Sequence, residues 1–245
     1  MLNYARVRHY INGTRVGRSM SLDPKVKAVV FDMDRTLLDT VVNFRKLMQI
    51  VGEEYMAGGV PQEVIAEDAK IMSTMNSAAW LKANLTPAQI AEINERIETR
   101  SIAVELETVD QAKPFPGAKE FVEKLIATGY KVAILTRGSK GYVKQCLEMC
   151  GMTDLFKVII DREDTTPEER KPHPKAMGYV SERIGVPCAN ILYIGDEPVD
   201  FKTATSAGTM FVGVETGPLD RAKWEAVAGK DVVTYPSITE FAKEL

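Results

Sequence analysis

Short apolar runs alternate with helical patterns along most of this chain. The runs cover residues 28–31, 132–135, 158–160, 191–194, 210–212 and 232–233. Runs this short, rich in branched side chains and apolar on both faces, are typical of central strands in a parallel sheet buried beneath helices. Amphipathic stretches lie between them, such as 118–128 before Gly129 and 140–149 before Gly151, where glycine favours the end of a helix. The repeated pattern predicts an α/β fold with a doubly wound parallel sheet.

The alternation stops in residues 41–112, which contain no convincing strand. Apolar residues recur at helical spacing over 42–51, and a second helical pattern runs over 61–75. Thr86-Pro87 is typical of an N-cap followed by the first position of a third helix. We therefore expect this segment to be an all-helical insert.

The insert divides one α/β core into two parts, which we place at 20–40 and 113–245. Residues 1–19 differ from both, because they contain four arginines and no acidic residue. Three interpretations are open for this segment: an edge hairpin turning at Asn12-Gly13, an Arg-rich transit segment, or an upstream extension of a protein that starts at Met20. We favour the extension.

Composition excludes several classes of protein. With 45% hydrophobic residues and 31 Lys+Arg against 34 Asp+Glu, the chain can build a core and is neither a disordered chain nor a broadly basic nucleic-acid binder. Its 3 cysteines show no CxxC spacing and its 2 histidines are too few for a multi-histidine site. No apolar run approaches the ~20 residues that span a bilayer. We expect a soluble cytoplasmic protein, a monomer or a homodimer, with neither nucleic acid nor membrane as partner.

Polar residues follow several of the expected strands at the point where each strand ends. They are Asp32 and Asp34 after the first run, Thr136, Arg137 and Gly138 after the second, Lys171 in the loop after the third, and Asp196 and Asp200 after the fourth. Ligands of open parallel sheets bind outside the carboxyl ends of the strands, so we expect these groups to share one site. Crowded carboxylates repel one another unless a hard cation binds, and a few carboxylates with water suit Mg²⁺. The pattern predicts a Mg²⁺ site.

The same residues suit the transfer of a phosphoryl group. Asp32 and Asp34 project to one side of an extended chain, where they can share a metal or divide the roles of nucleophile and acid–base. A carboxylate nucleophile, a metal and a lysine together neutralise the charge on a transferring phosphoryl group. Thr136, with the backbone amides of Arg137-Gly138 and a helix start near Ser139, can cradle a phosphate.

These segments resemble the four motifs of the haloacid dehalogenase-like superfamily. The motifs correspond to Phe31–Asp39, Thr136, Lys171-Pro172 and Gly195–Asp200. Their order and spacing fit over about residues 27–217, and four motifs placed at strand ends are far more specific than one alone. The helical insert resembles the cap of the phosphoglycolate phosphatase-like subgroup. The resemblance implies a Rossmann-like core with a helical cap that closes to exclude water.

The resemblance also implies a role for each motif residue. Asp32 attacks phosphorus to form an aspartyl phosphate, and Asp34 protonates the leaving oxygen and then activates water. Thr136 and Lys171 bind the phosphoryl oxygens. The implied Mg²⁺ site consists of the Asp32 carboxylate, the Asp34 backbone carbonyl and Asp196, with Asp200 among the ligands or directly behind them.

One position departs from the family pattern. The residue after the second aspartate is commonly glycine, and here it is Arg35. A side chain there either strains the turn that lets the cap open or reaches toward the substrate. Asp34 itself favours phosphate esters, because members that dehalogenate 2-haloacids lack an acid at that position.

We therefore expect a Mg²⁺-dependent phosphatase, a phosphoric monoester hydrolase acting on a small phosphorylated metabolite. Phosphoglycolate is the first candidate by resemblance, followed by sugar phosphates and nucleoside monophosphates. The nearest alternative is a phosphomutase of the same family, in which the phosphate must outlive the opening of the cap. A non-catalytic regulatory or binding protein on the same fold is another, although every chemically needed group is retained.

Overall fold

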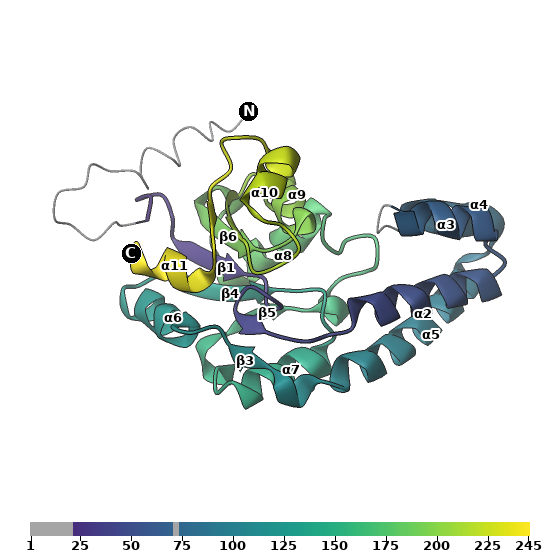
Figure 1. Ribbon diagram of the computed structural model, residues 1–245, viewed down its shortest axis with the longest axis horizontal. Coiled ribbons are helices and arrows are strands. Elements are labelled where there is room, and N and C mark those ends of the chain that lie inside the picture. Colours follow the sequence, from purple (N-terminus) through teal and green to yellow (C-terminus); the bar gives the residue numbers. More distant parts are fainter. Residues whose placement is uncertain (1–21, 71–73) are drawn as a thin grey trace. The chain divides into compact units, whose positions relative to one another are not determined.

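The computed structural model describes residues 22–70 and 74–245 (Figure 1). The three interpretations given for residues 1–19 concern a segment outside the described residues. The described chain forms two compact units. One is the core, residues 22–40 together with 111–245, and the other is a helical unit, residues 41–110.

A six-stranded parallel sheet forms the centre of the core. Its strands are β1 (Ala28–Phe31), β4 (Lys131–Leu135), β5 (Val158–Ile160), β6 (Ile191–Gly195), β7 (Met210–Val214) and β8 (Thr234–Tyr235), hydrogen-bonded in the order β5-β4-β1-β6-β7-β8. Each neighbouring pair is parallel. The chain builds outward from β1 on one side and then on the other, so the predicted doubly wound fold is confirmed. A separate antiparallel pair joins β2 (Leu38–Asp39) to β3 (Lys113–Pro114).

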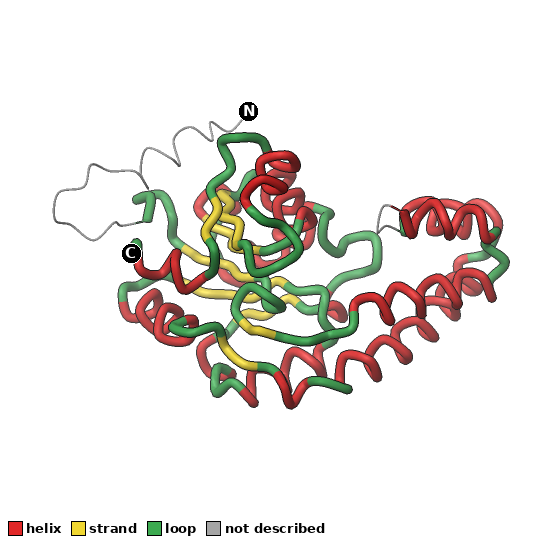
Figure 2. Tube along the Cα trace, viewed as in Figure 1, coloured by secondary structure: helices red, strands yellow, loops and turns green. Residues whose placement is uncertain are grey.

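Helices lie on both sides of the strands in the core, as Figure 2 shows. They are α6 (Ala118–Ala127), α7 (Lys140–Met149), α8 (Pro174–Ile184), α9 (Pro198–Ala207), α10 (Arg221–Ala228) and α11 (Ile238–Lys243). The core also contains the short 3₁₀ helices η2 (Thr153–Leu155), η3 (Arg162–Asp164) and η4 (Cys188–Asn190), and η1 (Val109–Gln111) spans the sequence boundary between the two units. α8 packs against β4 and β5, and α9 packs against β6 and β7. The glycines expected to end α6 and α7 do so with left-handed backbones, φ 90° at Gly129 and 60° at Gly151.

The strand expected at 232–233 is wrong by two residues, because β8 is Thr234–Tyr235. Val232 belongs to the turn that follows α10, where its N–H donates to the Gly229 carbonyl at 3.1 Å. Its side chain is buried in the main hydrophobic cluster with Phe211 and Trp224. The apolar character of this residue therefore reflects core packing before the strand rather than a place in the sheet.

The helical unit consists of α2 (Phe44–Ala57), α3 (Gln62–Lys70), α4 (Met75–Asn84) and α5 (Pro87–Leu106). The start signal expected at Thr86 is confirmed, since its side chain accepts the Gln89 N–H in a capping box. α2 and α5 are joined by the buried Glu54 carboxylate, which accepts hydrogen bonds from Arg96 at 2.7 Å and Arg100 at 2.8 Å. Within the described ranges, no helix is both long and apolar enough to cross a membrane.

The second helical pattern of this unit does not continue to Met75 as one helix. α3 ends at Lys70, and Met75 begins α4. The Asp68 carboxylate accepts the backbone N–H groups of Asn76 at 3.1 Å and Ser77 at 2.8 Å. An acidic side chain that satisfies the free N–H groups of a first turn starts a helix there, and the apolar spacing alone did not reveal this break.

Candidate active site

Three adjacent strands of the core each end in a predicted site residue. Asp32 follows β1, Thr136 follows β4 and Asp196 follows β6. The pairing continues past the strand ends, because the Asp32 N–H donates to the Ile194 carbonyl at 2.9 Å and the Thr136 N–H to the Ile160 carbonyl at 3.0 Å. The rigid edge of the sheet thus positions these side chains at the carboxyl end, where doubly wound folds bind ligands.

Carboxylates from two of these strands and from the start of α9 meet in one buried cluster. Oxygens of Asp32, Asp196 and Asp200 all lie within 4.8 Å of one another. Each of the three side chains is buried. A dry cluster of three carboxylates is unfavourable unless cations or donors neutralise it.

Lys171 supplies one cation to this cluster. Its buried Nζ donates to Asp32 Oδ1 at 2.6 Å, to Asp200 Oδ1 at 2.8 Å and to the Tyr193 hydroxyl at 3.0 Å. The Tyr193 hydroxyl in turn lies 2.8 Å from Asp200 Oδ1, to which it donates. Burial lowers the pKa of Lys171, but the charges of Asp200 and Asp32 outweigh it, so the pKa lies above its ordinary value. The lysine is therefore charged and fixed between two carboxylates.

One lysine does not neutralise three carboxylates. Burial raises the pKa of Asp32 to about 7; Lys171 opposes the rise, and the charges of Asp200 and Asp34 add to it. Burial also raises the pKa of Asp196 to about 9, assisted by the charges of Asp32 and Asp200. Carboxyl groups with pKa values raised in this way are expected where a buried cluster binds a further cation.

The surroundings of Asp196 fit a hard metal ion. Its Oδ2 is buried and accepts no hydrogen bond from the described residues. The other oxygen accepts one from the Thr36 hydroxyl at 3.3 Å. A Cβ on Gly217 would come within 2.0 Å of Asp196 Oδ2, so only glycine lets the backbone pack there. Oxygen donors alone, with no cysteine or histidine among them, suit Mg²⁺.

The side chain of Asp34 is not part of the three-carboxylate cluster. Its Oδ1 accepts hydrogen bonds from the Thr40 hydroxyl at 2.7 Å and the Tyr142 hydroxyl at 2.5 Å. Burial raises the pKa of Asp34 above its ordinary value, against the lowering effect of these two hydrogen bonds. Burial and the charge of Asp34 also raise the pKa of Tyr142 far above its ordinary value. Burial therefore favours the protonated form of Asp34, which is the form that an acid catalyst needs.

Asp200 is held at the start of α9. Its Oδ2 accepts the Glu197 N–H at 3.0 Å, and its Oδ1 takes the donors from Lys171 and Tyr193. A Cβ on Gly195 would come within 2.5 Å of Asp200 Cγ. With both oxygens occupied by donors, Asp200 fixes Lys171 in place.

The loop after β4 contains Thr136, Arg137 and Gly138, which we expect to bind a phosphate. The Gly138 N–H donates to Thr136 Oγ1 at 3.1 Å, so these two residues form a tight turn. The Arg137 guanidinium instead pairs with Glu197 at 2.8 Å and is about half exposed, 48% by side chain. The structure brings Thr136 and Gly138 together and directs the Arg137 side chain to the acid that follows Asp196.

Arg35 occupies the position where the family pattern has glycine. Its backbone lies in the left-handed region with φ 55°, which is costly for a side chain other than glycine. Arg35 Nε lies 3.4 Å from Asp196 Oδ2, and the guanidinium also pairs with Glu197. The Thr216 hydroxyl donates to the Arg35 carbonyl. The side chain therefore lies against an acid of the carboxylate cluster.

Sequence reasoning missed Thr40, Tyr142 and Tyr193. Tyr193 carried a usable signal, since it is a tyrosine inside the aliphatic strand β6, and a buried hydroxyl needs a partner. Tyr142 carried none, because a buried aromatic residue on a helix face is ordinary core packing.

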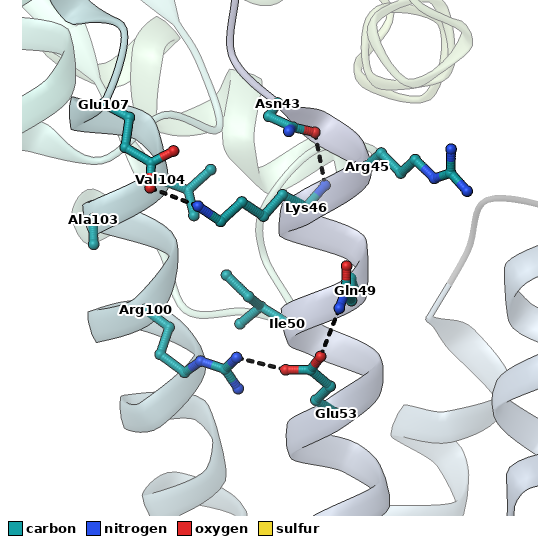
Figure 3. Close-up of a pocket in the computed structure, with 10 residues that line it drawn as sticks. All are labelled: Asn43, Arg45, Lys46, Gln49, Ile50, Glu53, Arg100, Ala103, Val104 and Glu107. Atoms are coloured by element: carbon teal, nitrogen blue, oxygen red, sulfur yellow. Dashed lines mark hydrogen bonds and ion pairs between the residues drawn. The ribbon is translucent and has the colours of Figure 1, made fainter.

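A hollow of about 490 Å³ in the helical unit has a different character (Figure 3). It lies along α2 and α5, with Ile50 and Val104 among its lining residues. Ion pairs join the two helices along it, Lys46 to Glu107 at 2.6 Å and Arg100 to Glu53 at 2.5 Å. Four of the five charged lining residues are thus paired with each other, and none of the predicted site residues lines the hollow.

Known proteins resemble this chain in both sequence and fold. The family model described as haloacid dehalogenase-like hydrolase matches residues 29–214. A phosphoglycolate phosphatase of Xanthomonas campestris is 29% identical over 210 residues, 82% of this chain and 90% of that protein. One from Pectobacterium atrosepticum is 26% identical over 197 residues, 78% of this chain and 81% of that protein. The crystal structure of a hydrolase from Pseudomonas syringae, 21% identical, matches with a TM-score of 0.61 over 88% of this chain and 95% of that one.

Proposed function

Because this chain belongs to the haloacid dehalogenase-like hydrolases, we propose that it is a Mg²⁺-dependent phosphatase that cleaves monoesters of small phosphorylated metabolites. The observation that carries the proposal is the buried cluster of Asp32, Asp196 and Asp200, held by Lys171 at the carboxyl edge of the sheet. The relatives described as phosphoglycolate phosphatases support phosphoglycolate as the first candidate substrate. Sugar phosphates and nucleoside monophosphates come next.

Asp32 is the nucleophile of this proposal. Lys171 holds Asp32 Oδ1, which leaves Oδ2 without a hydrogen bond among the described residues and free to attack phosphorus. As the new bond from Asp32 to phosphorus forms, the bond from phosphorus to the leaving oxygen breaks. Lys171 and Thr136 bind the phosphoryl oxygens and offset their charge.

Asp34 moves the proton in both steps. It first gives its proton to the leaving oxygen, which departs as an alcohol. It then takes a proton from water, whose oxygen attacks phosphorus while the bond to Asp32 breaks, releasing inorganic phosphate and restoring the Asp32 carboxylate. The raised pKa of Asp34 supports this role, because burial favours the protonated form of the carboxyl group more than water does.

Three oxygen donors would hold the metal: the Asp32 carboxylate, the Asp196 carboxylate and the Asp34 backbone carbonyl, with Asp200 directly behind them. Bound Mg²⁺ supplies positive charge that stabilises the phosphoryl oxygens. Asp196 Oδ2, which accepts no hydrogen bond from the described residues, supports this assignment.

We assign the helical segment, residues 41–112 by sequence and 41–110 by packing, to a cap that selects the substrate and excludes water. Its all-helical character and its place directly after the first motif support this. The free thiols of Cys146, Cys150 and Cys188 support a reducing compartment, and we propose that the protein acts in the cytoplasm as a monomer or homodimer.

A panel of phosphorylated metabolites tests the function. Purified protein with Mg²⁺ should release inorganic phosphate from at least one member and from an aryl phosphate, and Asp32→Asn should abolish the release while keeping the fold. Transfer to a second hydroxyl without net phosphate release indicates the phosphomutase instead. If the protein releases phosphate from no member of the panel, the remaining interpretation is a non-catalytic binding protein on the same fold.

A further inference from the structure

Tyr142 reaches from the first turn of α7 to the acid–base residue of the core. α7 begins at Lys140, directly after the Thr136 loop. The side chain of Tyr142 is almost fully buried, at 1% exposure, and its hydroxyl donates to Asp34 Oδ1 at 2.5 Å. A Cβ on Gly138 would approach the Tyr142 ring to 3.0 Å. Glycine at position 138 therefore leaves room for the ring as well as shaping the phosphate loop.

Thr40 donates to the same oxygen from another direction. Its buried hydroxyl lies 2.7 Å from Asp34 Oδ1. Within the described part of the chain, Asp34 Oδ2 receives no such donor. A protonated carboxyl group carries its one hydrogen on one of its two oxygens. A hydrogen on Oδ1 would point toward hydroxyl groups that already donate their own hydrogens to Oδ1. Two hydrogen bonds donated to Oδ1 therefore favour Oδ2 as the oxygen that carries the acidic proton of Asp34.

We propose that Tyr142 is a positioning residue for the reaction, which together with Thr40 fixes Oδ2 of Asp34 as the oxygen that exchanges protons with the leaving group and with water. The inference rests on the proposed phosphatase function. In the first step the proton on Oδ2 passes to the leaving oxygen as the bond from phosphorus to that oxygen breaks and the bond to Asp32 forms. In the second step a water proton returns to Oδ2 as the water oxygen replaces Asp32 on phosphorus.

A purely structural role of Tyr142 predicts a different outcome. If the ring only fills space in the core, Tyr142→Phe keeps the packing, and any loss of activity is equal for all substrates. If the hydroxyl positions the acid, the loss depends on how much the leaving oxygen needs a proton. An alkyl leaving group needs protonation, whereas p-nitrophenolate is stable as an anion and needs little.

The test compares kcat/KM of Tyr142→Phe for phosphoglycolate or glycerol 2-phosphate and for p-nitrophenyl phosphate. We use kcat/KM because it reports the step in which the leaving group departs. General acid catalysis contributes about 100- to 10,000-fold, so misplacing the acid should lower kcat/KM for the alkyl ester by about 10- to 100-fold. The value for the aryl ester should fall less than about 3-fold.

Three further variants complete the experiment. Thr40→Val should show the same selective loss, and Thr40→Ser, which keeps the hydroxyl, should restore most of the alkyl activity. Tyr130→Phe removes a hydroxyl from a half-buried tyrosine directly before β4, at the opposite end of that strand from Thr136, and it should change neither value. Thermal melting of each variant confirms the fold, and Thr40→Val carries the test if Tyr142→Phe does not fold.

The outcomes separate this inference from the proposed function. Wild-type activity with an equal loss on both esters, or with no loss, overturns the positioning role alone. Wild-type protein that cleaves neither ester overturns the phosphatase function and this inference with it.

Discussion

The Nζ atom of Lys171 lies 2.6 Å from Oδ1 of Asp32, although the two residues are 139 positions apart in the sequence. Both side chains are buried, and the same Nζ also holds Asp200 at 2.8 Å. A buried carboxylate pair stays ionised only if a cation remains between its members. The stability of the core and the ionised state of the nucleophile Asp32 therefore both depend on Lys171.

Lys171→Met should damage both properties. Removing the cation leaves Asp32 and Asp200 buried without it, and breaking a buried ion pair costs about 3–5 kcal/mol. Loss of a group that stabilises the phosphoryl oxygens should lower kcat by about 100- to 1,000-fold. Urea unfolding and phosphate release measure the two effects. Lys175→Met is the matched control, since Lys175 pairs with Glu169 on the surface; a similar loss in this control would contradict the assignment.

Mg²⁺ should stabilise the protein more strongly at high pH than at low pH. In the metal-free protein the pKa of Asp196 is raised to about 9 and that of Asp32 to about 7, from ordinary values of about 3.9. At pH values between the ordinary pKa and the raised pKa, the folded state binds more protons than the unfolded state. The free energy of unfolding of the metal-free protein therefore falls as pH rises from about 4 to about 9. Mg²⁺ binds the ionised carboxylates and reverses this loss.

Thermal melting with and without Mg²⁺ at pH 5 and pH 8.5 measures the effect. The rise in Tm caused by Mg²⁺ should be larger at pH 8.5, and Asp196→Asn should remove most of it. Asp154→Asn, at an exposed acid of the core, should leave it unchanged. An equal rise at both pH values would mean that the ion binds elsewhere. In the activity assay, EDTA should stop phosphate release.

Local patterns predicted most of the sheet and the residues at its edge, because β1, β4, β5, β6 and β7 are short apolar runs. Asp32, Thr136 and Asp196 each directly follow one of these strands. The contacts of Asp34 were beyond such patterns. Its partner Tyr142 is 108 positions away and lies on a helix face where an aromatic residue usually packs. Val232 misled the strand assignment because burial in the core and pairing in a sheet favour the same side chains. Sequence patterns did not predict these features because both depend on packing between residues far apart in the chain.

Arg35 should weaken Mg²⁺ binding, because its Nε lies 3.4 Å from Asp196 Oδ2 and repels a second cation. Arg35→Ala and Arg35→Gly both remove this charge, and each should tighten Mg²⁺ binding by about 3- to 10-fold, or roughly 1 kcal/mol. Calorimetric titration of the metal-free protein measures it. The two variants differ in the backbone, since φ is 55° at this position. Arg35→Gly should therefore be more stable than Arg35→Ala by about 1 kcal/mol.

Unchanged or weaker Mg²⁺ binding in both variants would show that Arg35 does not oppose the metal. Arg183→Ala serves as the control for a lost arginine charge, because Arg183 pairs with Asp164 on the surface. It should leave Mg²⁺ binding as in the wild type.

Gly217→Ala should disrupt the metal site from the loop after β7. The added Cβ would lie 2.0 Å from Asp196 Oδ2 and 2.8 Å from Asp196 Cβ, closer than atoms in contact can approach. Asp196 is buried at 1% exposure and has little room to move, so either the loop or the carboxylate must shift. Overpacking of this kind costs about 1–3 kcal/mol, and calorimetric titration should show Mg²⁺ affinity falling by about 10-fold or more.

Gly178→Ala provides the comparison for Gly217→Ala. Gly178 lies within α8, and a Cβ there would meet nothing within 4 Å. Alanine is favoured over glycine inside a helix by about 0.5–1 kcal/mol, so this variant should be slightly more stable and bind Mg²⁺ normally. If Gly217→Ala also keeps its Mg²⁺ affinity, Asp196 does not hold the metal through the oxygen that faces this loop.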